Sequence, residues 1–338
     1  MNIAINGFGR IGRLVLKAAL ENNLNVVVVN STSDPKIKAY YLKYDTLYGK
    51  YDRDVSYGKD YIKINKRKIK SLTERDITKL PWKKLKIDYV IESTGIFTDA
   101  RLSKKHLEAG AKRVFITAPA QNQDITLVPG VNDEMLKKEH KIISVGSCTT
   151  NCLAPMVKVL DNKFGIRKGF ATTIHAYTSD QNLVDDSHPK LRRGRSAALN
   201  IVPTNSGAAQ AVIEAMPKMK NKLDTIAIRV PVGCGSITDL VCELKKKVTV
   251  TQVNNLFKLA SKGKMKNIIE YSEEELVSSD IIGNSHSVII DGLTTRTNGN
   301  IIKVLGWYDN EYGYSCRVID AVKMVNKLKQ WEKKKNFY

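Results

Sequence analysis

The sequence predicts an α/β protein in which a doubly wound parallel sheet is followed by an α+β part with a largely antiparallel sheet. Three observations support this fold class. The chain has 338 residues, a length that suits about two domains. Up to about residue 147, short apolar runs alternate with amphipathic helical stretches. After that point the apolar runs become longer and more β-rich.

The first 30 residues follow the order strand, glycine-rich turn, helix, strand. The apolar run 3–5 is followed by Gly7-x-Gly9-x-x-Gly12, a helical stretch at 13–21 and a β-branched run at 26–29. In this context Gly7 permits a tight turn, Gly9 admits a pyrophosphate against the backbone, and Gly12 lets helix and strand approach closely. The pattern therefore predicts a Rossmann-type dinucleotide-binding domain.

The elements that follow continue both patterns. In the first half, strands are expected at 88–92 and 113–117, with a helix at 102–109 between them. In the second half, strands are expected at 169–175, 225–231, 236–250, 285–293 and 301–308, and helices at 153–161, 206–216, 251–262 and 315–331. We expect a dinucleotide-binding domain over 1–147, a catalytic domain over 148–310, and a C-terminal helix in 311–338 that returns to the first domain.

The end of the second strand indicates which dinucleotide is bound. Dinucleotide-binding domains that use NAD usually place an acidic residue there, where it accepts hydrogen bonds from the adenosine ribose. Here Ser31 and Thr32 follow the strand. A carboxylate repels a 2′-phosphate whereas hydroxyls can donate to it, so the sequence favours NADP, or the use of both NADP and NAD. The alternative is that nearby Asp34 replaces the missing acid.

Cys148 is the candidate nucleophile. It precedes the helical stretch 153–161, for which Thr150 or Asn151 is the expected cap. A thiol at a helix N-terminus lies at the positive end of the helix dipole, which lowers its pKa. Cys152 falls one turn later and is expected to be buried and inert. His175, at the end of a predicted strand, is the candidate base.

Composition excludes several other classes of protein. Five cysteines without a CxxC pair argue against a disulfide framework, and the scattered histidines offer no metal site. No apolar run reaches the ~20 residues that a bilayer requires, and no leader sequence is evident, so a cytoplasmic location is expected. The net charge of +21 attracts anions in general. Because the basic residues are not interleaved with aromatic ones, nucleic acid remains only an alternative partner.

Several motifs resemble those of phosphorylating glyceraldehyde-3-phosphate dehydrogenases. The most specific is Ser147-Cys148-Thr149-Thr150-Asn151-Cys152-Leu153-Ala154-Pro155, which is similar to the active-site signature of that family. The resemblance spans nearly the whole chain and includes residues 5–13, 42–45, 92–95, 203–209, 229–231 and 307–311.

The resemblance implies a reaction through a cysteine thioester. Cys148 attacks the aldehyde of glyceraldehyde 3-phosphate, and His175 takes the proton and assists hydride departure to NADP or NAD. Inorganic phosphate then displaces the acyl group, which gives 1,3-bisphosphoglycerate. A homotetramer is also implied. The nearest alternative is an erythrose-4-phosphate dehydrogenase, which hydrolyses the thioester.

The resemblance also implies the binding residues. The substrate phosphate is assigned Thr178, Asp180 and Arg229; the attacking phosphate is assigned Ser147, Thr149, Ser206 and Gly207; Arg193 reaches toward both. The nicotinamide carboxamide is assigned Asn310, with Tyr314 beside it, and the 2′-phosphate of NADP is assigned Ser31, Thr32, Ser187 and Arg75. Asp186 next to Ser187 opposes NADP binding. The remaining cofactor contacts are Gly7, Gly9, Arg10, Ile11, Gly12, Gly95 and Thr117.

Overall fold

The computed structural model describes residues 1–335, and the chain divides into two compact units. Unit 1 consists of Met1–Leu127, Asp133–Gly146 and the segment that begins at Ser315. Unit 2 consists of Val128–Asn132 and Ser147–Tyr314. Each unit has its own sheet and its own clusters of buried apolar side chains.

Unit 1 contains a nine-stranded sheet in the order β10-β11-β9-β8-β1-β2-β7-β6-β5. Neighbouring strands are parallel from β10 to β7, and the two hairpin pairs β7-β6 and β6-β5 are antiparallel. The strands are β1 (Ile3–Asn6), β2 (Val26–Asn30), β5 (Val55–Tyr57), β6 (Tyr61–Ile64), β7 (Arg67–Leu72), β8 (Tyr89–Glu92), β9 (Arg113–Ile116), β10 (Ile125–Thr126) and β11 (Ile142–Ser144).

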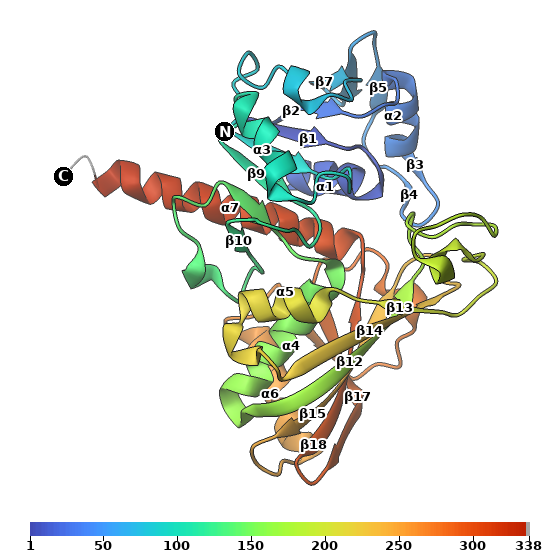
Figure 1. Ribbon diagram of the computed structural model, residues 1–338, viewed down its shortest axis with the longest axis vertical. Helices are drawn as coiled ribbons and strands as arrows, with labels where there is room; N and C mark the ends of the chain where they lie inside the picture. The colour runs from blue at the N-terminus through green and yellow to red at the C-terminus, as the bar shows by residue number, and fades with distance from the viewer. Residues whose placement is uncertain (336–338) are drawn as a thin grey trace. The chain divides into compact units, whose positions relative to one another are not determined.

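Short helices connect these strands, as expected for a parallel sheet (Figure 1). They are α1 (Arg10–Glu21), α2 (Pro35–Lys43), α3 (Ala100–Glu108), η1 (Ile77–Lys79) and η2 (Asp133–Met135), and β3 (Tyr44–Asp45) pairs with β4 (Gly49–Lys50) in a separate hairpin. The long helix α7 (Tyr312–Lys335) contributes the buried residues Val318, Val322 and Val325 to this unit. The Rossmann-type α/β fold predicted for this part of the chain is confirmed.

Unit 2 contains a seven-stranded sheet in the order β13-β14-β12-β15-β18-β17-β16. Four of its neighbouring pairs are antiparallel, and β12-β14 and β16-β17 are parallel, so the predicted largely antiparallel sheet is correct. The strands are β12 (Ile166–Ala176), β13 (Val202–Asn205), β14 (Leu223–Val230), β15 (Ser236–Leu244), β16 (Ile269–Ser272), β17 (Val288–Asn298) and β18 (Ile301–Tyr308).

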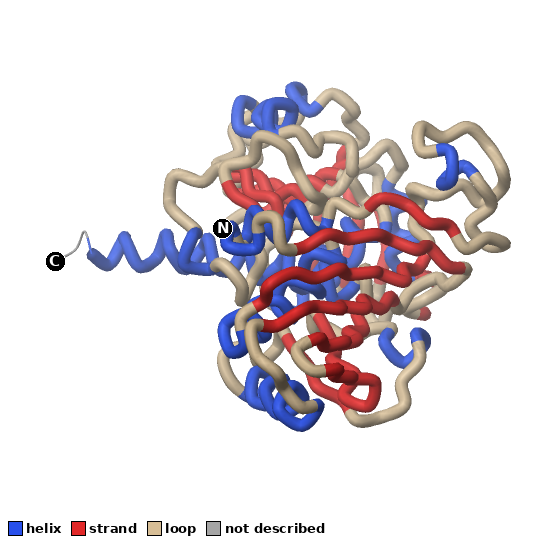
Figure 2. Tube along the Cα trace, turned by 60° about the horizontal axis from the view of Figure 1, so that its bottom comes forward, coloured by secondary structure: helices blue, strands red, loops and turns tan. Residues whose placement is uncertain are grey.

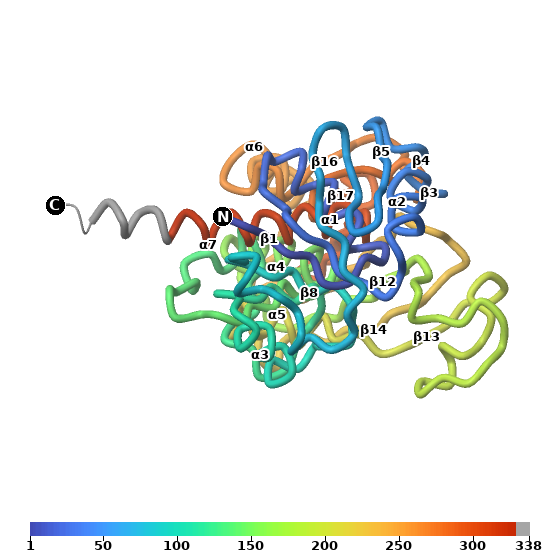
Figure 3. Tube along the Cα trace, turned by 90° about the horizontal axis from the view of Figure 1, so that it is seen from above, coloured from blue at the N-terminus to red at the C-terminus, as the bar shows by residue number. Residues whose placement is uncertain are grey.

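Three helices cover one face of this sheet (Figure 1). They are α4 (Cys148–Phe164), α5 (Ala208–Ala215) and α6 (Val250–Lys262), with the short helices η3 (Leu191–Gly194), η4 (Pro217–Met219) and η5 (Ser278–Ile281) in the loops. Buried apolar side chains of α4 and of the strands form the main core beneath them. The segment between β12 and β13 forms long loops that project beyond the edge of the sheet (Figure 3).

No helix crosses the opposite face of the seven-stranded sheet in the view of Figure 2. The residues that point to that face alternate with buried ones along β12, and they include apolar side chains. Phe170 is 69% exposed, Ile226 is 45% exposed and Val241 is 38% exposed. This face therefore carries an apolar patch, formed by Phe170, Ile226 and Val241.

Three predicted boundaries are wrong by five residues or more. The strand expected at 285–293 runs from Val288 to Asn298. The strand expected at 236–250 ends at Leu244, because the lysines that follow lead into a helix that Thr249 caps with its side chain. The helix expected to begin near residue 153 begins at Cys148, and its cap is Ser147 rather than Thr150 or Asn151. At the start of α4, Ser147, Thr150 and Asn151 all suit the capping position, and only the tertiary structure selects which one starts the helix.

Candidate active site and dinucleotide cavity

Cys148 is the first residue of α4 in unit 2. Ser147 caps this helix: its Oγ accepts a hydrogen bond from the Thr150 N–H at 3.0 Å, and the Thr150 hydroxyl accepts from the Ser147 N–H at 3.2 Å. This reciprocal pair fixes the start of the helix and thus the backbone of Cys148. The Cys148 side chain is only partly buried, whereas Cys152, one turn later, is 0% exposed.

His175 lies next to the thiol. Its Nε2 is 3.3 Å from the Cys148 Sγ, and its Nδ1 is 2.7 Å from the carbonyl oxygen of Ala176. A carbonyl only accepts hydrogen bonds, so Nδ1 carries the proton and Nε2 presents its lone pair to the thiol. The Tyr308 ring packs edge-on against the imidazole, and its hydroxyl bonds the hydroxyl groups of Thr149 and Thr173. The imidazole is therefore held with its basic nitrogen toward the sulfur.

Burial sets the proton affinities of this pair. Burial and, to a smaller extent, the charge of Arg229 lower the pKa of His175 to about 3. Burial raises the pKa of the Cys148 thiol, while Arg229 and the amide of Thr149 act in the opposite direction. The prediction of a lowered thiol pKa, which rested on the helix N-terminus alone, is wrong. Burial raises the pKa by more than the helix N-terminus lowers it. Burial also raises the pKa of Cys152, in keeping with an inert thiol.

Cationic and hydroxyl side chains surround the pair. Arg229 donates from one nitrogen to the carbonyl of Ala176 at 3.2 Å and to the Thr178 hydroxyl at 3.1 Å, so both predicted residues lie beside His175. Arg193 is buried, and its charge acts on both His175 and Arg229. Its guanidinium is already engaged by Asp180, by the Thr204 hydroxyl and by the carbonyl of Asn205.

The other residues assigned to phosphate or to the nicotinamide lie on different elements of unit 2. Ser206 and Gly207 precede α5, where the Ser206 hydroxyl accepts from the Ala208 N–H at 3.2 Å. Asn310 is 4% exposed, and its side-chain oxygen is 2.9 Å from the hydroxyl of Ser236, which also accepts from the Ala176 N–H. Ser236 thus ties Asn310 to the peptide after His175, a link that no local pattern indicated. Tyr314 is buried, and Ser187 is exposed in the loop after β12.

Unit 1 holds a cavity of about 530 Å³ at the carboxyl ends of β1 and β2. Gly7 has a φ of 93°, and a Cβ there would lie 2.5 Å from the backbone of Ser93. A Cβ on Gly12 would lie 2.1 Å from the Gly7 carbonyl oxygen, whereas one on Gly9 would meet open space. The N-terminus of α1 has no side-chain cap. Its backbone N–H groups therefore suit an anion such as a pyrophosphate.

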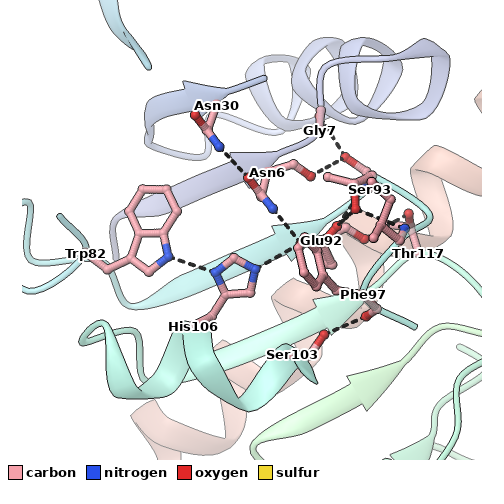
Figure 4. A network of polar contacts seen from close by, with 12 residues as sticks. Asn6, Gly7, Asn30, Trp82, Glu92, Ser93, Phe97, Ser103, His106 and Thr117 are labelled. Carbon is pink, nitrogen blue, oxygen red and sulfur yellow. Dashed lines mark hydrogen bonds and ion pairs between the residues drawn. The ribbon is translucent and has the colours of Figure 1, made fainter. Parts of the chain in front are cut away.

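A buried polar network supports the floor of this cavity (Figure 4). Glu92 is 2% exposed and accepts from the Asn6 amide at 2.6 Å and from the Thr94 N–H at 2.8 Å. His106, on α3, lies with its Nε2 at 2.9 Å from the same carboxylate. Because the Trp82 indole N–H donates to the other nitrogen of His106, the Nε2 carries a proton and donates to Glu92. Sequence patterns alone gave no signal for this network.

The predicted cofactor residues of unit 1 are distributed around this cavity. Gly7, Gly9, Ser31, Thr32 and Arg75 line it, together with Asn6, Asn30, Lys38, Glu74 and Thr94. Ile11 and Gly12 lie in the first turn of α1, Thr117 donates from its hydroxyl to the Glu92 carbonyl, and Gly95 follows Thr94 with a φ of 75°. Arg10 is outside the lining and forms an ion pair with Asp45 at 3.1 Å. Asp34 is exposed and caps α2.

Comparisons with known proteins agree with this arrangement. A family model described as glyceraldehyde 3-phosphate dehydrogenase, NAD binding domain, matches residues 1–100, and one described as glyceraldehyde 3-phosphate dehydrogenase, C-terminal domain, matches residues 147–310. The glyceraldehyde-3-phosphate dehydrogenase 2 of Bacillus subtilis (strain 168) is 49% identical over 328 residues, which cover 96% of both chains. The chain belongs to the glyceraldehyde-3-phosphate dehydrogenase family.

Other members of the family are equally similar. The glyceraldehyde-3-phosphate dehydrogenase of Mycobacterium avium is 50% identical over 97% of this chain and 99% of the relative. That of Borreliella burgdorferi is 50% identical over 96% of this chain and 100% of the relative. The predicted family, the oxidoreductase class and the overall function are therefore confirmed, and the cofactor belongs to the NAD(P) type. Within the described residues, no helix has the length and apolarity needed to cross a membrane.

Proposed function

We propose that this member of the glyceraldehyde-3-phosphate dehydrogenase family oxidises and phosphorylates glyceraldehyde 3-phosphate through a thioester on Cys148, with NADP favoured over NAD. The observation that carries the proposal is the 3.3 Å contact between the Cys148 Sγ and the unprotonated Nε2 of His175 at the start of a capped helix. A thiol paired with an oriented base is the arrangement that nucleophilic catalysis needs.

The residues of unit 2 provide the proton and charge steps. His175 accepts the thiol proton as Cys148 attacks the aldehyde carbon, and the protonated imidazole then faces the oxygen on which negative charge develops. When bound, the nicotinamide accepts the hydride. Oxidation leaves a thioester on Cys148, which inorganic phosphate opens to the acyl phosphate and the free thiolate.

We assign anion binding to the hydroxyl and guanidinium groups around this pair. Thr178 and Arg229, which contact each other beside His175, suit the phosphate of the substrate, with Asp180 positioning Arg193. Ser147, Thr149, Ser206 and Gly207 suit the attacking phosphate. Asn310 is assigned to the carboxamide of the nicotinamide, because its oxygen bonds Ser236 and its amide nitrogen is left to donate.

The cavity of unit 1 supports the preference for NADP. Ser31 and Thr32 line the cavity just after β2, and Arg75 lines it from the loop that follows β7. Asp34 is not part of the lining, and its carboxylate caps α2 by accepting from the Ile37 N–H at 2.8 Å. This engagement weakens the alternative that Asp34 replaces the missing acid.

We also propose a homotetramer in the cytoplasm, with the dinucleotide-binding domain in 1–147, the catalytic domain in 148–310 and the returning helix in 311–338. The apolar patch of Phe170, Ile226 and Val241 supports an assembly, because a surface of this kind favours contact with another subunit.

Steady-state kinetics tests the proposed function. We expect kcat/KM for glyceraldehyde 3-phosphate to be higher with NADP than with NAD and to require inorganic phosphate. Turnover that proceeds equally well without phosphate would instead indicate a hydrolysing enzyme such as an erythrose-4-phosphate dehydrogenase. A preference for NAD would overturn the assignment of Ser31 and Thr32.

A further inference from the structure

Lys38 is a buried lysine on α2 that forms no ion pair within the described part of the chain, although the charge of Asp34 offsets the cost of its burial in part. Its side chain is 2% exposed and lines the same cavity as Gly7 and Gly9. The ammonium donates to the Ser71 hydroxyl at 2.9 Å and to the Leu72 carbonyl at 2.5 Å. Both acceptors are neutral, and no carboxylate of the described residues forms an ion pair with it. A buried cation of this kind favours a bound anion.

The ammonium lies at the end of β2, where the sequence lacks the usual acidic residue. The Leu72 carbonyl that accepts from Lys38 also accepts from the Ser31 N–H at 3.2 Å, so both groups meet at one oxygen. The Ser31 hydroxyl is buried and has no hydrogen-bond partner among the described residues. An unpartnered hydroxyl beside an unpaired cation is an arrangement that an anionic oxygen of a ligand completes.

The other charged groups at the cavity leave a net positive lining. Arg13 and Arg75 line it alongside Lys38, and Glu74 is the acidic residue in the lining. One carboxylate oxygen of Glu74 already accepts from the Asp76 N–H at 2.8 Å. The potential in the cavity therefore favours a phosphate over a neutral hydroxyl.

We infer that Lys38 is a specificity-determining residue. Its buried ammonium attracts the 2′-phosphate of NADP, which then lies beside the hydroxyl of Ser31. This inference rests on the proposed dinucleotide role of the cavity. Lys38 is 2% exposed, and the attraction exerted by a buried charge is stronger than that of a charge at the surface. NAD carries a neutral 2′-hydroxyl at the same place and gains little from Lys38. Ser31 and Thr32 accept or donate hydrogen bonds, while Lys38 supplies the charge that separates the two cofactors.

Binding of the two adenosine halves tests this inference without catalysis. Isothermal titration at pH 7 compares 2′,5′-ADP with 5′-AMP on the full-length protein and on its variants. We expect the wild type to bind 2′,5′-ADP the more tightly. Lys38→Met should lower the affinity for 2′,5′-ADP by roughly tenfold, as expected for loss of one buried charge contact. It should change the affinity for 5′-AMP by less than about twofold. Lys36→Met, which removes an exposed lysine of the same helix, should change neither.

Lys38→Gln separates the charge from the hydrogen bond. The amide still donates to the Leu72 carbonyl, so this variant should fold, yet it should lose 2′,5′-ADP affinity as Lys38→Met does. The inference would be overturned if the ratio of the two affinities in Lys38→Gln equals that of the wild type, whether or not both affinities fall. Turnover with glyceraldehyde 3-phosphate, phosphate and saturating NAD, measured on the same samples, tests the proposed function separately.

Discussion

At the scale of single residues, the hydrogen bond from His175 to the Ala176 carbonyl decides the chemistry of the site. It places the proton on Nδ1 and leaves the lone pair of Nε2 facing the Cys148 thiol, as the proposed mechanism requires. His175→Asn removes this base while keeping a polar side chain. We expect kcat to fall by about 10²–10⁴-fold, the range typical of a lost general base. The rate of Cys148 alkylation by iodoacetamide should fall as well, since the thiol loses its proton acceptor.

The control for this prediction is cofactor binding to unit 1, which should be unchanged in His175→Asn. Cys148→Ser provides the complementary case, because a hydroxyl cannot form the thioester at a useful rate. It should abolish turnover and still bind NADP. Retained turnover in Cys148→Ser would exclude the thioester mechanism.

Lys38 also makes stability depend on pH in a defined direction. Burial lowers the pKa of Lys38 to about 8 from 10.5, with Asp34 opposing the shift in part. Between these two pH values the unfolded chain keeps the proton that the folded chain has lost. Stability therefore rises with pH across this window. Urea unfolding should show the wild type gaining free energy of unfolding relative to Lys38→Met from pH 8 to pH 10.5; a constant difference would contradict the assignment.

At the scale of elements, the Glu92 network joins β1, β8 and α3 beneath the cavity (Figure 4). All groups that bond the Glu92 carboxylate donate a hydrogen to it. In Glu92→Gln the amide NH₂ replaces one carboxylate oxygen and therefore faces at least one of these donors. We expect a loss of about 1–3 kcal/mol of unfolding free energy, the cost of leaving a buried polar group unpaired. Affinity for NADP should also fall, because Asn6 and Thr94 line the cavity.

Glu108→Gln is the matched control for this change. Glu108 lies on α3, the helix that carries His106, but it is exposed and outside the network. Its substitution should alter neither urea unfolding nor cofactor affinity. Similar losses in both variants would mean that the loss of a negative charge, rather than the loss of the network, is responsible.

Two helices with the same kind of cap allow stability and activity to be separated. Ser147 caps α4 and Thr249 caps α6, each in a reciprocal pair with the residue three positions on. Ser147→Ala and Thr249→Ala should each cost about 1 kcal/mol of stability. Only Ser147→Ala should also raise the KM for phosphate, because α6 has no part in the proposed site. Parallel kinetics and urea unfolding check this, and an unchanged KM in Ser147→Ala would remove Ser147 from the phosphate site.

Local sequence predicts the parts of the fold whose cause is local. The glycines at 7, 9 and 12 predict the strand, turn and helix at the N-terminus. The conformation of Gly7 and the close approach at Gly12 demand the absence of a side chain, whereas Gly9 faces open space. The cap of α4 was misassigned because Ser147, Thr150 and Asn151 all suit that position. The pairing of Glu92 with Asn6 and the contact of Lys38 with Leu72 of β7 join segments that are far apart in the sequence, so no nearby pattern records them.

At the scale of the whole molecule, the two units give ligand binding a local signature. The cavity that we assign to NADP belongs to unit 1 alone, so binding should protect β1, α1 and β2 most strongly. A ligand at 100 times its Kd stabilises the folded state by about 2.7 kcal/mol. Hydrogen exchange with and without NADP, on the wild type and on Cys148→Ser, should show the same protection in both. Protection confined to unit 2 would contradict the assignment of the cavity.

The two units become complete at different times while the chain is synthesised. Unit 2 is almost one continuous stretch that is complete at Tyr314, whereas unit 1 includes residues from Ser315 onward, so this segment of unit 1 is translated after all of unit 2. Val318, Val322 and Val325 can cover their apolar surroundings only when the C-terminus has left the ribosome. All residues of unit 2 are therefore present in the nascent chain before unit 1 can finish folding. A chain truncated before Ser315 is expected to expose apolar residues in the N-terminal part of unit 1.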